Sequence, residues 1–347
     1  MKKKILMTMA LTAIMALTGC SSGSGNDNES NESKGSDTLV LYSPNSEGLV
    51  NAIIPAFEEK TGITVELQQA GTGELFTKLQ GEKADPVADV IWGGSYNTYL
   101  ENKDLFEEYV SPNDEKLPKA YQNTEGFKTS YTLDGSVLIV NKDLTKGMDI
   151  KSYDDLLNPK LKGKIATADP ASSSSAFAHL TNMLKAKGGY DSDEAWEYVK
   201  KLFTNIDGKI QSSSSSVYKT VVDGEMAVGL SYEDPVMQLV KDGADNIEIV
   251  YMDEGVVYLP AGSAIIKNAK NMENAKKFID FIIDKQAQDT LGKETTNRPV
   301  REDAEVSDFM TPIDKINVIE EDYDYVREHS SEITDRYKEI FTSIQGN

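Results

Sequence analysis

The sequence predicts an α/β protein with two lobes and a ligand cleft between them. Short runs rich in β-branched and aromatic residues alternate with amphipathic helical patterns, which is typical of parallel βαβ units. This alternation begins near residue 38 and again near residue 135. The stretch from residue 38 to residue 347 also exceeds the size at which one hydrophobic core usually keeps growing. We therefore expect a first lobe, a crossing to a second lobe and a return.

The N-terminus predicts an exported and lipid-anchored protein. Residues 1–19 combine three lysines with a short apolar run, the pattern of a signal peptide, and the run is too short to span a bilayer. The segment LTGC resembles the bacterial lipobox, in which the cysteine, here Cys20, becomes the lipidated first residue. Because Cys20 is the only cysteine, we expect no internal disulfide and a large stabilising core. The polar residues 20–37 predict a flexible tether.

The net charge is strongly acidic and limits the partners. It is -21 for the whole chain, and removing the signal with Lys2, Lys3 and Lys4 makes it -24. Such a surface repels nucleic acid and anionic lipid, so we expect no nucleic-acid partner. It leaves an anionic ligand possible, because backbone amides and helix ends set the field inside a cleft. Beyond the signal, we expect no segment that crosses a membrane.

The first lobe is expected at residues 38–134. Strands are predicted at 38–42, 64–68 and 89–92, and helices at 47–60 and 74–81. The first helix carries Val50, Ile53, Ile54 and Phe57 at helical spacing, which predicts one buried face.

The second lobe is expected at residues 135–250, and residues 251–347 are expected to return to the first lobe and to end in helices. The second lobe is predicted to have strands at 135–144 and in GKIATADP, GKIQ and MAVGL, and helices at 174–187, 192–204, 217–224 and 235–243. The segment NIEIVYMDEGVVYLPAGSAIIK predicts two more strands. MENAKKFIDFIIDKQAQDTLGK predicts one long amphipathic helix.

Ligands of open parallel sheets bind at the carboxyl ends of the strands. In the first lobe these ends carry small or polar residues, and we take as candidate ligand-binding positions Ser43, Asn45, Thr72, Gly73, Gly94 and Ser95.

The order of several segments points to a known family. LVLYS, AFEEKTGITVEL, ADVIWGG, GKIATADP with its serine-lined helix start, VVDGEMAVGLSYED and NRPVRED together resemble the ABC-transporter substrate-binding proteins of the ferric-iron, thiamine and phosphorylated-solute cluster. The resemblance covers essentially all of the chain after the signal. It implies a type II periplasmic-binding-protein fold that closes on a solute and delivers it to a membrane permease. It also implies a monomer without cofactor, held at the outer face of the bacterial cell membrane through Cys20.

Two serine runs acquire a function within that fold. An isolated serine run is usually a linker, but here each run joins a strand end to a helix start, where backbone N–H groups and hydroxyls make an anion site. The candidate positions are Ser172, Ser173, Ser174, Ser175, Ser214 and Ser215.

These positions favour a phosphate or phosphonate group, as in a sugar phosphate or an aminoalkylphosphonate. The carboxylates of Glu233 and Asp234 would accept hydrogen bonds from hydroxyls or pair with an amine. Arg298 would bind phosphate oxygens with two parallel hydrogen bonds.

Two other ligands stay open. Iron-binding members of the cluster present adjacent tyrosines after the strand that matches MAVGLSYED. Here only Tyr232 stands there, and a ferric site would use Tyr232, Glu233 and Asp234 as oxygen ligands; otherwise we expect no metal. Thiamine would need stacking on aromatic rings, for which the candidates are Tyr42, Trp92, Tyr131 and Tyr232.

A secreted hydrolase is the remaining alternative class. The chain has two histidines, His179 and His329, and lacks the G-x-S-x-G, H-E-x-x-H and G-x-x-x-x-G-K-[ST] motifs. Within its helix, His179 is interpreted as a structural residue. We therefore expect a binding protein and no enzyme.

Overall fold

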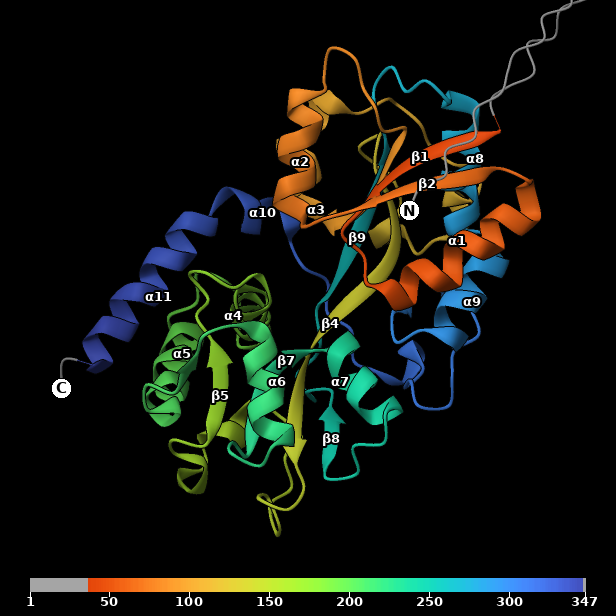
Figure 1. Cartoon of the computed structure of the whole chain (residues 1–347). Coiled ribbons are helices and arrows are strands. Elements are labelled where there is room, and N and C mark those ends of the chain that lie inside the picture. The colour runs from red at the N-terminus through yellow and green to blue at the C-terminus, as the bar shows by residue number, and fades with distance from the viewer. Residues whose placement is uncertain (1–36, 346–347) are drawn as a thin grey trace, which may run out of the picture. The chain divides into compact units, whose positions relative to one another are not determined.

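The computed structural model describes residues 37–345. Its first elements are β1 (Thr38–Ser43), α1 (Glu47–Thr61), β2 (Thr64–Gln69), α2 (Thr72–Gly81), β3 (Val90–Ser95) and α3 (Tyr96–Glu101). β1 pairs in parallel with both β2 and β3, so the predicted βαβ arrangement is confirmed here (Figure 1). The predicted apolar face of α1 is buried.

A long strand, β4 (Thr129–Asn141), joins the two groups of elements. Its first half pairs antiparallel with β9 (Tyr258–Ile265), and its second half pairs antiparallel with β7 (Val228–Tyr232) and β8 (Ile247–Val250). β9 in turn pairs with β3. The partner of β4 changes from β9 to β7 between Gly135 and Ser136. Because β4 is unbroken at this point, one continuous strand carries the chain from the first group to the second.

The second group surrounds the other half of β4. It contains β5 (Ile165–Ala168), α4 (Ser174–Ala186), α5 (Asp193–Ile206), β6 (Ile210–Gln211), α6 (Ser214–Val222), β7 and α7 (Glu233–Lys241). β5 runs parallel to β6 and to β7. α4 begins at the predicted residue, whereas α6 begins three residues before the expected start at residue 217, because Ser213 caps it.

The chain then returns to the first group. α8 (Met272–Ile282) and α9 (Lys285–Glu294) replace the single long helix that the sequence predicted. The break falls at Asp284, whose carboxylate accepts a hydrogen bond from the Ala287 backbone N–H and starts a new helix. After β10 (Arg298–Pro299), α10 (Tyr323–Glu328) and α11 (Ser330–Gln345) end the described chain. Tyr337 and Phe341 of α11 pack on Phe203 of α5. The last helix therefore lies against the second group, whereas residues 251–347 were expected to return to the first lobe.

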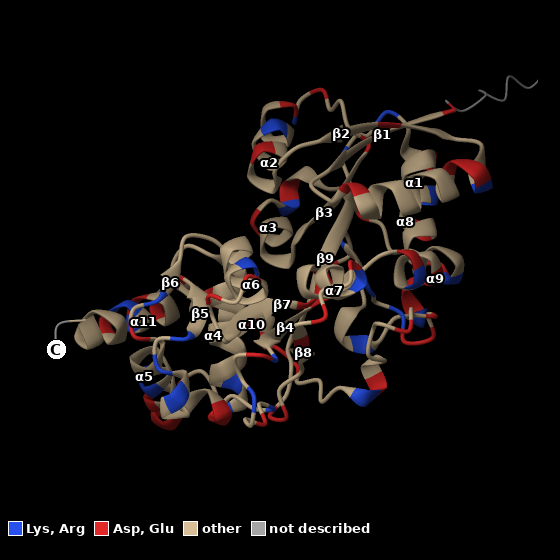
Figure 2. Ribbon diagram, turned by 60° about the horizontal axis from the view of Figure 1, so that its bottom comes forward, with Lys and Arg blue, Asp and Glu red and all other residues tan. Residues whose placement is uncertain are grey.

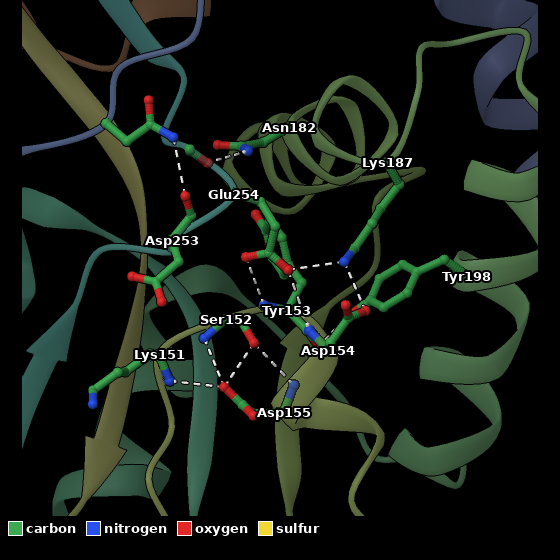
Figure 3. A network of polar contacts seen from close by, with 12 residues as sticks. Lys151, Ser152, Tyr153, Asp154, Asp155, Asn182, Lys187, Tyr198, Asp253 and Glu254 are labelled. Atoms are coloured by element: carbon green, nitrogen blue, oxygen red, sulfur yellow. Dashed lines mark hydrogen bonds and ion pairs between the residues drawn. The ribbon is translucent and has the colours of Figure 1, made fainter.

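Polar contacts fix the C-terminal end of α4 to its surroundings (Figure 3). The Lys187 ammonium lies 2.8 Å from Glu254 Oε1 and 2.7 Å from Asp154 Oδ1. The Asn182 side chain donates to the Gly255 carbonyl and accepts from the Val257 N–H. These contacts hold α4 against the segment that leads into β9, and thereby set where its N-terminus lies.

Acidic side chains are concentrated at residues 320–324, where Glu320, Glu321, Asp322 and Asp324 lead into the first turn of α10. Acidic and basic residues are spread over both groups of elements (Figure 2). Within residues 37–345, no helix combines the length and the apolar character needed to span a bilayer.

Candidate ligand pocket

The two serine runs meet in the structure. Ser173 caps α4 by accepting a hydrogen bond from the Ala176 N–H, and Ser213 caps α6 by accepting one from the Ser216 N–H. The Ser173 and Ser214 hydroxyl oxygens lie 3.0 Å apart. Because β5 and β6 are parallel neighbours, the helices that follow them begin side by side. Two helix N-termini therefore present first-turn N–H groups and serine hydroxyls to the same space.

That space is a cavity of about 560 Å³, which is within the range of small-molecule sites. Ser95, Leu259 and Pro260 contribute walls on the β3 and β9 side, and Asp134 and Ser136 of β4 contribute another. Eight predicted site residues line it: Gly94, Ser95, Ser172, Ser173, Ser174, Ser175, Ser214 and Tyr232.

The polar lining is neutral or acidic. None of the described residues that line this cavity is Lys, Arg or His, and two are acids, Asp134 and Asp169. Burial raises the pKa of the Asp134 carboxyl well above its usual value, and the nearby carboxylates of Asp234 and Glu233 raise it further. Among the described residues, Asp134 Oδ1 has no hydrogen-bond partner. An anion in this cavity would rely on hydroxyls and helix N-termini.

Several predicted site residues lie outside this cavity and contact other parts of the protein. Ser43 is fully buried and donates to the Trp92 carbonyl, as does the Asn45 side-chain amide. Thr72 and Gly73 form the first turn of α2 and do not line the serine-lined cavity. Ser215, on α6, contacts the Ser213 hydroxyl at 3.0 Å and likewise stays outside the lining.

Glu233 and Arg298 bind each other instead of facing the cavity. Arg298 Nε and Nη2 lie 2.8 and 2.5 Å from the two oxygens of Glu233, and both side chains are 2% exposed. Burial alone would lower the pKa of Arg298, but its hydrogen bonds to Glu233, together with the attraction of that carboxylate's charge, outweigh burial and raise the pKa. The expected role of Arg298 as a phosphate ligand therefore does not fit this structure, nor does that of Glu233 as an acceptor for the solute. Tyr251 and Tyr258 also donate to Glu233.

The three residues proposed for a ferric site do not converge. Tyr232 lines the serine cavity, Glu233 is paired with Arg298, and Asp234 accepts from Thr296 and Asn297. Within residues 37–345, no cluster of three or more His, Cys, Asp or Glu side chains is arranged to hold a metal ion.

The aromatic residues considered for thiamine belong largely to the core. Tyr42, Trp92 and Tyr131 are at most 1% exposed. Trp92 packs on Tyr131 and on Phe278. Only Tyr232 of the four lines the cavity.

Other cavity residues escaped the sequence analysis. Asp134 and Ser136 lie within the crossing strand, and Leu259, Pro260 and Ala261 lie within β9. No local pattern distinguishes them from structural strand residues. Asp169 precedes the first serine run, and Ser213 lies within the second run, so both were within reach of the helix-start argument.

The fold and this pocket define a two-lobed solute-binding protein. The model of the family described as bacterial extracellular solute-binding protein matches residues 52–313, and the chain belongs to this family. It is the substrate-binding protein of an ABC importer and acts outside the cytoplasm. Solute-binding proteins of this family are not enzymes.

Named relatives differ in what they bind. A probable ABC transporter periplasmic-binding protein of Sinorhizobium fredii is 26% identical, over 71% of this chain and 69% of its own length. Iron uptake protein A1 of Synechocystis sp. is 26% identical, over 76% of this chain and 75% of its own. The periplasmic binding protein AfuA from Actinobacillus pleuropneumoniae, solved with exogenous fructose-6-phosphate bound, is 28% identical, with a TM-score of 0.68 over 90% of this chain and 98% of its own.

Proposed function

We propose that the protein captures a small phosphorylated or phosphonate solute, such as a sugar phosphate or an aminoalkylphosphonate, and delivers it to its permease. The observation that carries this proposal is the 3.0 Å contact between Ser173 and Ser214, which brings two helix starts into one cavity. Hydroxyls and helix N-termini are well suited to phosphate oxygens. The relative solved with fructose-6-phosphate supports the same ligand class.

The binding step is proposed to be lobe closure. The lobes are taken as residues 38–134 with the return at 251–347, and residues 135–250, except that α11 packs on α5 of the second lobe. The change of partner along β4 at Gly135 supports this division. A solute that contacts both groups of elements shifts the population toward the closed form.

A lipid anchor is also proposed, with the mature protein a monomer. Cys20 and the signal peptide lie outside the described residues, and the lipobox-like LTGC supports the anchor. Metabolic labelling with a palmitate analogue should mark the wild type and leave Cys20→Ser unlabelled and released. Labelling of the variant would refute the anchor.

A thermal-shift screen tests the ligand class. The mature protein is titrated with glucose-6-phosphate, 2-aminoethylphosphonate, inorganic phosphate, ferric citrate and thiamine. A ligand at about 1,000 times its dissociation constant stabilises the folded state by about 4 kcal/mol. We expect the largest shift from an organic phosphate or phosphonate. A shift with ferric citrate alone would favour iron and refute the proposal.

Matched serine variants locate the site. Ser174→Ala with Ser214→Ala removes two cavity hydroxyls, and we expect weaker binding with the unfolding temperature of the free protein retained. Ser343→Ala on α11 removes a serine that lines no part of this cavity, and we expect wild-type binding. Equal affinities in all three proteins would remove the serines from the site.

A further inference from the structure

A second cavity adjoins the serine-lined one. Its volume is about 540 Å³, and it lies between α4 and the two C-terminal helices. The two cavities share a set of lining residues: Ser95, Ser172, Ser173, Ser174, Ala178, Leu259 and Pro260. The two spaces are therefore compartments of one site, and the serine run of α4 lies at their junction.

The inner walls of the second compartment are largely apolar. Phe177 of α4, Val326 and Tyr323 of α10, and the strand residues Leu259 and Pro260 line it. Tyr323 is held rigidly, since its hydroxyl donates to the Tyr258 carbonyl at 2.9 Å and its ring stacks on Tyr96 with centroids 5.2 Å apart. Such a wall suits an apolar body.

The outer wall is one face of α11. Ser331, Thr334, Asp335 and Lys338 line the compartment at helical spacing. The neighbouring face of α11 carries the buried Tyr337, which packs on α5. The lining face is therefore held in place by packing of the neighbouring face of the same helix.

The charged groups of the second compartment already have partners. Lys338 Nζ lies 3.3 Å from Asp335 Oδ1. The Glu321 carboxylate accepts hydrogen bonds from the hydroxyls of Thr181 and Tyr190. Because the buried Glu321 is satisfied within the protein and the pair of Lys338 and Asp335 lies at the exposed rim, the interior of the compartment favours a neutral occupant over an ionic one.

We propose that the solute has two parts, an oxyanion that binds at the serine-lined helix starts and a neutral aromatic body that fills the compartment beneath α11. This inference rests on the proposed function and deepens it, since it selects aryl phosphates or phosphonates within that ligand class. Phe177 and Tyr323 supply apolar contact for a ring, and Ser172, Ser173 and Ser174 lie where the two parts of the solute join.

Calorimetric titration of the mature protein with two phosphate monoesters tests this inference. Phenyl phosphate carries the ring and methyl phosphate lacks it, while both present the same oxyanion. We expect phenyl phosphate to bind the wild type at least ten-fold more tightly. Equal affinities, or tighter binding of methyl phosphate, would overturn the inference and leave the proposed function standing. If neither ester binds, the inference is overturned. If glucose-6-phosphate and 2-aminoethylphosphonate do not bind either, the proposed function is overturned as well.

Blocking variants connect the ring preference to this compartment. Thr334→Trp fills it from α11, and we expect the ten-fold preference to disappear while methyl phosphate binds as before. Ser331→Trp, on the exposed side of the same wall, serves as a second blocking variant if Thr334→Trp does not fold. The control is Glu339→Trp, which adds the same bulk to an exposed position of α11 outside the lining and should keep the preference. A preference retained in a folded blocking variant would also overturn the inference.

Discussion

The buried ion pair between Glu233 and Arg298 gives a sharp stability prediction. In Arg298→Met, the Glu233 carboxylate stays 2% exposed and loses both guanidinium hydrogen bonds. Removing one partner of a buried ion pair destabilises proteins by about 3–5 kcal/mol. Because the hydroxyls of Tyr251 and Tyr258 still donate to Glu233, we expect a loss near the lower end, about 3 kcal/mol.

Urea unfolding followed by circular dichroism and by tryptophan fluorescence measures this loss. The two signals must give the same transition before a single free energy of unfolding is assigned to a two-lobed chain. If the m-value is unchanged, a shift of the urea midpoint reports a change in stability. The double variant Glu233→Gln with Arg298→Met removes both charges, so we expect it to recover most of the loss.

An exposed ion pair provides the matched control. Lys146 and Asp143 are 3.0 Å apart with 79% and 66% of their side chains exposed, so Lys146→Met should leave the midpoint unchanged. Two results would refute the reasoning that each buried charge depends on the other. One is a loss of unfolding free energy below about 1 kcal/mol in Arg298→Met. The other is a loss in the double variant that equals the sum of the losses in the two single variants.

Four further predictions concern single side chains. Burial lowers the pKa of His179 to about 4, below the value of about 6.5 in the unfolded chain. The contribution of neutral His179 to the free energy of unfolding is therefore fully present above pH 6.5, and about 3 kcal/mol of it is lost as the pH drops toward 4. The urea midpoint of unfolding should therefore fall less steeply with decreasing pH in His179→Gln than in the wild type. Burial raises the pKa of Asp134, so its carboxylate should weaken the binding of inorganic phosphate only as the pH rises through that pKa; binding by Asp134→Asn should weaken less than binding by the wild type over the same pH range, and identical pH profiles would place Asp134 outside the site. Ser173→Ala removes the cap of α4 and should lower the free energy of unfolding by about 1 kcal/mol, whereas no loss would argue against the cap. Gly94→Ala should lower the unfolding temperature, because φ is +107° and the added Cβ would lie 3.1 Å from Thr72 Cγ2; a wild-type temperature would contradict the strain.

Much of the fold was accessible from the sequence because its signals are local. Hydrophobic periodicity predicted α1 and the parallel β1, β2 and β3, and the serine run after GKIATADP predicted the start of α4. The single predicted helix at 272–293 was wrong because the apolar pattern continues through Ile283, while the cap that divides the helix depends on one residue, Asp284.

Only part of the site could be predicted from the sequence, because its other features depend on contacts between residues far apart in the chain. The serine runs were predicted from strand and helix ends, and the structure brings them together. Arg298 pairs with Glu233 across 65 positions of sequence, and no local pattern indicates that pairing. Asp134 lies within a strand whose side chains alternate between cavity and core, so its place depends on the fold around it.

The pairing of β3 with β9 has a consequence for biosynthesis. Val90 lies opposite Ile265, so the early strands of the chain obtain one of their neighbours only after most of the sequence has been made. Until β9 arrives, β3 would present an unpaired edge open to other chains. Contacts so distant in sequence also slow folding. A protein with this connectivity suits export as an unfolded chain, since the first group of elements cannot complete its sheet before β9, at residues 258–265, has crossed the membrane.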